Sequence, residues 1–108
     1  MYIKLMLTVI ESPEFIECAA KVWSNDERSE FISWIAANPL AGDLIPGSGG
    51  LRKVRWGRAG RGKSSGARVV YFVRTARGEL LLVTVYTKGR IENIPAHLLR
   101  DLMEKYDV

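Results

Sequence analysis

The chain has 108 residues, of which 47% are hydrophobic and 26% charged, a size and composition typical of one soluble globular domain spanning residues 1–108. Its single cysteine, Cys18, excludes an internal disulfide, and no apolar run approaches the roughly 20 residues of a membrane span, so we expect a cytoplasmic protein. The formal net charge is +4, but residues 51–90 alone carry eleven basic side chains and one acidic side chain, Glu79.

The first half of the sequence predicts one strand followed by two helices. Residues 2–10 are rich in β-branched and aromatic side chains, which favours a strand. Ser12 is followed by Pro13 and Glu14, a typical helix start, and Ser24 with Glu27 forms a capping box that opens a second helix. Asn38 precedes a proline and therefore ends that helix. The side chains expected on the buried stripes are Phe15, Cys18, Ala19, Val22, Phe31, Trp34 and Ile35.

The second half predicts three strands and a last helix. A connection rich in glycine and proline, residues 39–50, leads to strands over 51–56, 67–74 and 80–87. A tight turn over 76–78 joins the last two strands. A helix begins after Asn93. Its expected core-facing residues are Leu98, Leu99, Leu102, Met103 and Tyr106.

The element order is therefore β-α-α-β-β-β-α. Such an order is typical of an α+β fold with a mostly antiparallel sheet and helices on one face.

The density of cations in residues 51–90 indicates a polyanionic partner, and nucleic acid or the ribosome is the natural candidate. Three aromatic residues, Trp56, Tyr71 and Tyr86, lie in the same block. The alternative is a basic surface that only aids solubility.

Residues 57–64, GRAGRGKS, match the phosphate-loop pattern of nucleoside triphosphatases. That motif needs a helix after it, whose N-terminus faces the phosphates, whereas the sequence predicts a strand from Ala67. We therefore reject a triphosphatase and interpret this segment as a flexible cationic loop that can contact phosphate.

Basic side chains are predicted to gather on one face of the sheet. Alternation along a strand points Val54 and Trp56 into the core and leaves Lys53 and Arg55 side by side on the other face. If the strands form a meander, the ends that carry Arg68, Tyr86 and Lys88 converge on the same region; a row of ordinary exposed strand residues is the alternative. A cluster of cations with one phenol suits RNA cleavage by the 2′-hydroxyl, which needs stabilisation of charge on phosphate and proton transfer.

Other candidate site residues have structural interpretations. His97 lies in the first turn of the last predicted helix, where packing or surface exposure is the expected role. Cys18 lies on an apolar helix stripe. One cysteine and one histidine do not supply a structural zinc site in a monomer, and we expect neither a metal nor another cofactor.

The sequence resembles the RelE/ParE superfamily of toxins, and within it the HigB-like branch of type II toxin–antitoxin modules. The resemblance covers nearly the whole chain. It rests on the element order and on two segments with a distinctive spacing of glycines and basic residues, NPLAGDLIPGSGGLRKVR over 38–55 and GRGKSSGAR over 60–68, together with the strand that contains Tyr71.

The resemblance implies an α+β toxin that enters the ribosomal A site and cleaves mRNA during translation, without a metal. It places Arg68 at the scissile phosphate, with the remaining catalytic positions on Lys53, Arg55, Tyr86 and Lys88. In this interpretation Lys53, Arg55 and Lys88 stabilise charge, or one of the two lysines transfers a proton. The predicted RNA- or ribosome-binding residues are Arg52, Arg58, Arg61 and Lys63. Many RelE members carry a tyrosine near the last helix, but here Ile91 to Ile94 offer none before Tyr106.

The resemblance also implies a cognate antitoxin, commonly with a helix-turn-helix domain, that neutralises the toxin and carries the complex to operator DNA. Three other functions remain open. A ParE-like gyrase inhibitor would not depend on the cationic cluster. A non-catalytic binding module would bind RNA with a steep salt dependence and no cleavage. An inactive toxin homologue would bind its antitoxin only.

Overall fold

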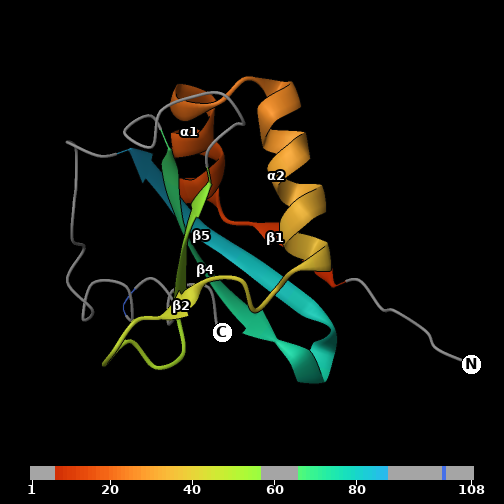
Figure 1. Ribbon diagram of the computed structural model, residues 1–108, viewed down its shortest axis with the longest axis vertical. Coiled ribbons are helices and arrows are strands. Elements are labelled where there is room, and N and C mark those ends of the chain that lie inside the picture. The colour runs from red at the N-terminus through yellow and green to blue at the C-terminus, as the bar shows by residue number, and fades with distance from the viewer. Residues whose placement is uncertain (1–6, 57–65, 88–100, 102–108) are drawn as a thin grey trace, which may run out of the picture.

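The computed structural model describes residues 7–56, 66–87 and 101. Five strands and two helices follow one another along the chain (Figure 1): β1 (Thr8–Glu11), α1 (Pro13–Val22), α2 (Asn25–Ala37), β2 (Asp43–Leu44), β3 (Arg52–Trp56), β4 (Ala67–Arg74) and β5 (Glu79–Thr87). A short 3-10 turn, Thr75–Arg77, joins β4 to β5, and the predicted turn glycine Gly78 follows it with a positive φ of 64°. Of the predicted last helix the structure describes only Asp101, which is helical, and the other residues of this helix lie outside the described ranges.

The five strands form one sheet in the order β1-β5-β4-β3-β2. β3, β4 and β5 are the predicted antiparallel meander, and β1 pairs with β5 in the parallel direction. The α+β prediction is therefore confirmed, with a mixed sheet that is mostly antiparallel. The first described strand, β1, is an edge strand that lies beside β5, so segments from both ends of the described ranges meet at this edge of the sheet.

Both helices begin at the residues that the sequence predicts. Ser12 is the N-cap of α1 and its hydroxyl accepts a 3.0 Å hydrogen bond from the amide of Phe15. Ser24 and Glu27 form a reciprocal capping box at the start of α2. Such caps satisfy amides that have no partner inside the helix. α2 ends at Ala37, directly before the predicted stop.

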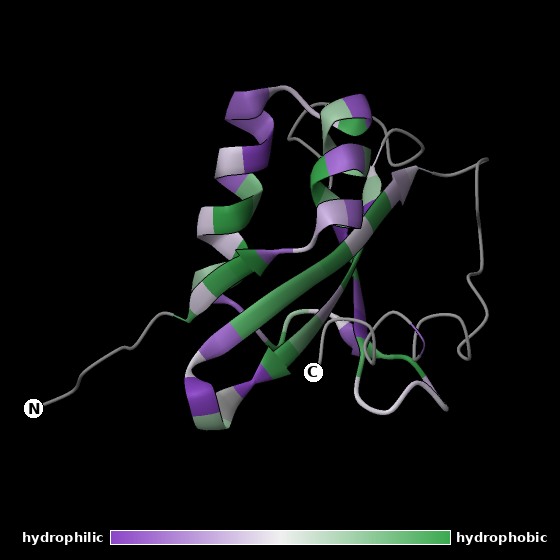
Figure 2. Ribbon diagram, turned by 180° about the vertical axis from the view of Figure 1, so that it is seen from behind, coloured by the Kyte–Doolittle hydropathy of each residue, from purple (hydrophilic) through white to green (hydrophobic). Residues whose placement is uncertain are grey.

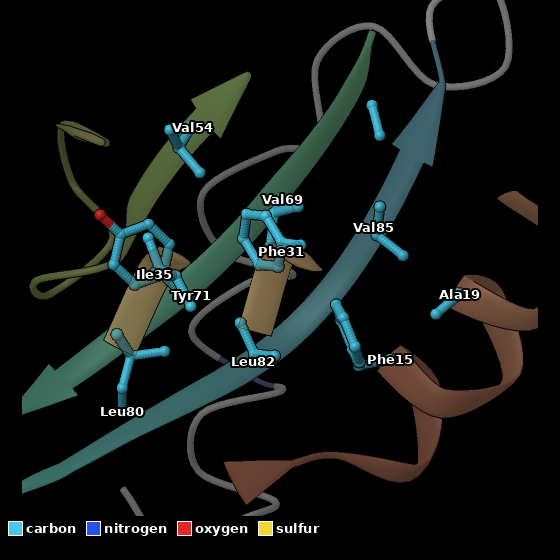
Figure 3. Packing of buried hydrophobic residues seen from close by; sticks show 11 residues of the cluster. Phe15, Ala19, Phe31, Ile35, Val54, Val69, Tyr71, Leu80, Leu82 and Val85 are labelled. Carbon is cyan, nitrogen blue, oxygen red and sulfur yellow. The ribbon is translucent and has the colours of Figure 1, made fainter. Parts of the chain in front are cut away.

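The helices cover one face of the sheet, and the main core lies between these two layers (Figure 3). Figure 2 shows hydrophobic colouring along most of β5 and hydrophilic colouring on the first turns of α2, as expected for a central strand and a surface helix. Phe15, Phe31 and Ile35 of the predicted helix stripes are fully buried against β4 and β5. Trp34, Cys18 and Val22 are partly buried against the same core.

The opposite face of the sheet, here called the open face, carries its own buried apolar cluster. The members of this cluster are Leu51, Val70, Leu81, Val83 and Tyr86. None of the described helices contributes to it. The open face therefore combines apolar side chains with the basic positions of β3 and β4.

A β-bulge interrupts the pairing of β4 with β5. Val70 is opposite Thr84 and Tyr71 is opposite Leu82, so Val83 has no partner in β4. An extra residue of this kind resets the alternation of side chains along a strand. Leu82 and Val85 consequently both lie in the core under the helices, although they are three residues apart.

The connection 39–50 differs from its prediction as a simple loop, because Asp43 and Leu44 pair with β3. Tyr71, which is fully buried, fixes this connection: its hydroxyl donates to the carbonyl of Pro39 and accepts from the amide of Gly42, both at 2.8 Å. Two residues are too short to show a strand period, which is why the sequence does not predict β2. None of the helices in the described part of the chain is long and apolar enough to cross a membrane.

Candidate functional site

Three predicted site residues lie in one row across β3, β4 and β5, close to one end of these strands. In the ladder, Arg55 of β3 is opposite Arg68 of β4, and Arg68 is opposite Tyr86 of β5. Residues that are directly opposite in an antiparallel pair have Cβ atoms about 5 Å apart on the same face. The predicted convergence of these strand ends is therefore observed for Arg55, Arg68 and Tyr86, which form the row described below.

Lys53 lies on the same face, two residues before Arg55. It is opposite Val70, a member of the open-face cluster. Val54 lies between the two basic residues in sequence and packs into the core under the helices, as predicted. Lys53 thus extends the row of cations along β3.

Arg68 has a partly buried guanidinium group. Among the described residues its buried Nη1 atom has no hydrogen-bond partner, and no acidic side chain there lies within 4 Å of Lys53, Arg55 or Arg68. A buried guanidinium N–H without a partner carries a free-energy cost, which an anionic ligand removes. The arrangement therefore favours binding of phosphate or another oxyanion beside Arg68.

Tyr86 supplies the only phenol of the row. Its side chain is 6% exposed and joins the open-face cluster. Burial raises its pKa above the usual value of 10.0, and the positive charge of Arg68 offsets part of that increase. The phenol is consequently protonated at neutral pH, and in that form it donates a hydrogen bond or a proton.

Arg52 occupies a different position from the other basic residues of β3. It is opposite Tyr71, a residue of the core under the helices, and its Nη1 donates a 2.7 Å hydrogen bond to the carbonyl of Gly42. This bond ties β3 to the connection that Tyr71 also holds. The contact of Arg52 with RNA stays a prediction, whereas the observed hydrogen bond to Gly42 stabilises the fold.

Several predicted residues fall outside the described part of the chain, namely Arg58, Arg61, Lys63, Lys88 and His97. A strand begins at Ala67, as the rejection of the phosphate-loop motif predicts. Cys18 is half-buried beside the core, with its Sγ 3.8 Å from the hydroxyl of Thr84. Within the described ranges, no three histidine, cysteine or acidic side chains are grouped to hold a metal ion.

Asp43 is a neighbour of the row that the sequence analysis did not single out. It is the register partner of Lys53 across β2 and β3, and its side chain is exposed. The short strand β2 brings this carboxylate to the edge of the cationic region. Asp43 is recognised as a neighbour of Lys53 only from the pairing of β2 with β3. The sequence analysis missed it because no pattern in the sequence predicts that pairing.

Taken together, the row can hold a phosphate by arginine, stabilise negative charge and donate a proton. Guanidinium groups bind phosphate oxygens in a bidentate manner, and two arginines with a lysine can neutralise the extra charge of a pentacovalent phosphate. The site therefore suits an anionic phosphodiester ligand.

Comparisons with known proteins agree with this architecture. No family model matches the sequence. The structure is similar to a chain of the RelBE2 toxin–antitoxin complex from Mycobacterium tuberculosis, with a TM-score of 0.60 and 13% identity over 78% of this chain and 100% of that chain. It is also similar to a double mutant of the E. coli toxin RelE in the free state, with a TM-score of 0.60 and 14% identity over 96% of this chain and 100% of that chain. The chain therefore has a RelE-like fold, whereas the HigB-like branch stays a prediction.

Proposed function

We propose that this protein is the toxin of a type II toxin–antitoxin system, a cytoplasmic endoribonuclease that cleaves mRNA on the ribosome and inhibits translation. The observation that carries the proposal is the partly buried Arg68, flanked in register by Arg55 and Tyr86 on a RelE-like fold. A gyrase inhibitor has no need of such a row. For that reason the nuclease is favoured over the ParE-like alternative.

In this proposal the 2′-oxygen of the substrate attacks the neighbouring phosphorus and the bond to the leaving 5′-oxygen breaks. Arg68 binds the scissile phosphate, and Arg55 and Lys53 stabilise the charge that develops on it. Tyr86, protonated at neutral pH, donates a hydrogen bond to the phosphate or the proton that the 5′-oxygen needs. Lys88 is proposed as a further catalytic residue.

Tyr86 holds its proton at neutral pH and therefore does not act as the base for the 2′-hydroxyl. We propose that the 2′-hydroxyl gives up its proton to water as it attacks, and that the ribosome positions the message for this attack. The remaining basic residues are proposed to bind ribosomal or messenger RNA: Arg52, Arg58, Arg61 and Lys63.

We propose a cognate antitoxin as the protein partner. One of the structures with this fold is a chain of a toxin–antitoxin complex, which supports a corresponding complex here. An acidic antitoxin segment suits the open face, because none of its three cations, Lys53, Arg55 and Arg68, forms an ion pair with an acidic side chain among the described residues. Operator DNA would be reached only through the antitoxin.

The test is induction of the protein in growing bacteria and mapping of new 5′ ends on a translated message. The variants are Arg68→Ala and, as a matched control, Arg77→Ala, an exposed arginine in the turn at the other end of β4. We expect codon-phased ends from the wild type and from Arg77→Ala, and none from Arg68→Ala at equal protein levels. The ends should vanish when translation of that message is blocked.

Other outcomes overturn the proposal. Growth arrest with intact messages and broken chromosomal DNA would identify a gyrase inhibitor. Soluble protein without arrest and without new ends would identify a binding module or an inactive homologue. Equal cleavage by Arg68→Ala would remove the role proposed for Arg68.

A further inference from the structure

The face on which Tyr86 lies depends on the bulge in β5. In a regular strand, residues three apart point to opposite faces. Leu82 and Val85 nevertheless both pack under the helices, and Val83 and Tyr86 both lie in the open-face cluster (Figure 3 shows Leu82 and Val85 pointing toward Phe15). Without the bulge, Tyr86 would continue the alternation of Leu80 and Leu82 and point under the helices. The bulge therefore brings the phenol beside Arg68.

Ser12 holds the bulged residue. Its hydroxyl donates a buried 2.8 Å hydrogen bond to the carbonyl of Val83, the residue without a partner in β4. Its amide donates a 3.0 Å bond to the carbonyl of Leu82. The side chain is 2% exposed, so water does not compete for these bonds. A buried carbonyl outside the ladder needs such a donor.

The same hydroxyl also caps α1, since it accepts from the amide of Phe15 at 3.0 Å. One hydroxyl therefore connects the first turn of α1 to the irregular point of β5. A hydroxyl can play both parts because it has one hydrogen to donate and two lone pairs to accept. Glycine at this position would keep most of the stability that the N-cap gives to α1, but it would remove the hydrogen bond to the carbonyl of Val83.

We propose that Ser12 is a positioning residue for the candidate site: by satisfying the carbonyl of Val83 it fixes the bulge, and the bulge places Tyr86 opposite Arg68. Ser12 touches none of the cations of the row and acts only through the backbone of β5. This inference deepens the proposed function, because it gives the phenol its place in the site. The part of the inference that concerns the position of Tyr86 does not depend on whether the protein cleaves RNA.

The test compares Ser12→Gly with Ser24→Gly, a matched loss of a cap hydroxyl on α2 that does not contact β5. Two NMR readouts follow the bulge: contacts between the Tyr86 ring and the methyl groups of Val70, and hydrogen exchange of the amides of residues 83–86. In Ser12→Gly we expect weaker ring-to-methyl contacts and exchange at least about tenfold faster, which a difference of about 1.4 kcal/mol in opening free energy produces. Ser24→Gly and the rescue variant Ser12→Thr should match the wild type.

A cleavage assay then separates positioning from simple support of the fold. We expect Ser12→Gly to lower kcat about as much as Tyr86→Phe does, with KM little changed, and the double variant to be no slower than Tyr86→Phe. If Ser12→Gly does not fold, Ser12→Cys serves instead, because a thiol keeps the shape but is a weak donor.

The inference is overturned if the ring contacts and exchange of Ser12→Gly equal those of the wild type. It is also overturned if Ser24→Gly causes the same changes, since the effect would then be general loosening. A protein that shows the expected NMR changes but cleaves no message keeps the positioning role and contradicts the proposed nuclease. The two failures are thereby distinguished.

Discussion

Arg55 lies directly opposite Arg68 in the antiparallel ladder of β3 and β4, so two guanidinium groups share one position of the sheet. Like charges that face each other across strands destabilise the pair, by about 0.2–1 kcal/mol in general. Within the described residues no carboxylate lies within 4 Å of either. The row therefore keeps its positive potential for a ligand, at a cost in stability.

Replacing Arg55 with glutamine should stabilise the free protein. We expect the free energy of unfolding to rise by about 0.5 kcal/mol at low salt, because the repulsion between Arg55 and Arg68 is removed. The gain should shrink toward zero near 1 M salt, where charges are screened within about 3 Å. Urea denaturation at both salt concentrations measures the effect. Arg77→Gln is the control and should change little; a loss of stability in Arg55→Gln at low salt would contradict the expectation.

Removing the hydroxyl of Tyr71 should destabilise the fold. Tyr71→Phe leaves the amide of Gly42 without its acceptor and the carbonyl of Pro39 without its donor. Buried groups that lose their partners cost about 1–3 kcal/mol. We expect a loss of that size by urea denaturation.

Gly42→Ala is a second test of the same contact, since an added Cβ would lie 2.8 Å from the hydroxyl oxygen of Tyr71 and 2.9 Å from the carbonyl of Lys53. We expect this variant to be destabilised as well. Wild-type stability in both variants would show that the connection 39–50 is not held by Tyr71.

Stability should depend on pH in the alkaline range. Burial raises the pKa of Tyr86 above 10.0, so above about pH 10 the unfolded chain loses this proton before the folded protein does. The stabilising difference is complete below the unfolded pKa and is lost as pH rises through the folded pKa. We expect the free energy of unfolding to decrease from about pH 10 upward, and less steeply in Tyr86→Phe. Denaturation of both proteins between pH 8 and 11 gives the two slopes; identical slopes would contradict the raised pKa.

Asp43 should weaken the binding of RNA. The carboxylate is the register partner of Lys53 and opposes phosphate at this edge of the site. We expect Asp43→Asn to bind a short single-stranded RNA about twofold more tightly at low salt, the effect of one unit charge at roughly 8 Å in water. Fluorescence anisotropy measures the affinity, with Asp26→Asn on the exposed start of α2 as the control. Cleavage lost with binding unchanged would instead assign Asp43 a part in the reaction.

The sequence predicts the helices and the central strands well because their signals are local. The hydroxyl of Ser12 and the pair of Ser24 with Glu27 define the starts of the helices, and the limits of β4 match the prediction from Ala67 to Arg74. Alternation along β3 also predicts the faces of Lys53 and Arg55, because that strand is regular.

The features that the sequence does not predict depend on contacts between residues that are distant in sequence. The face of Tyr86 depends on a bulge whose stabilising donor is 71 residues away in sequence, and alternation alone points the phenol the wrong way. The family resemblance groups Arg52 with the RNA-binding residues, yet its observed hydrogen bond goes to the carbonyl of Gly42. The direction of β1 beside β5 and the pairing of Asp43 likewise depend on contacts that no local pattern encodes.

The place of β5 between β1 and β4 has a consequence for biosynthesis. During translation the chain emerges from the N-terminus, and β5, the strand that pairs with β1 in the described sheet, becomes available only when residues 79–87 have left the exit tunnel. Pairing between segments so distant in sequence is slow to form. Because Tyr86 lies in β5, a nascent chain assembles the row of Arg55, Arg68 and Tyr86 only after residues 79–87 have emerged.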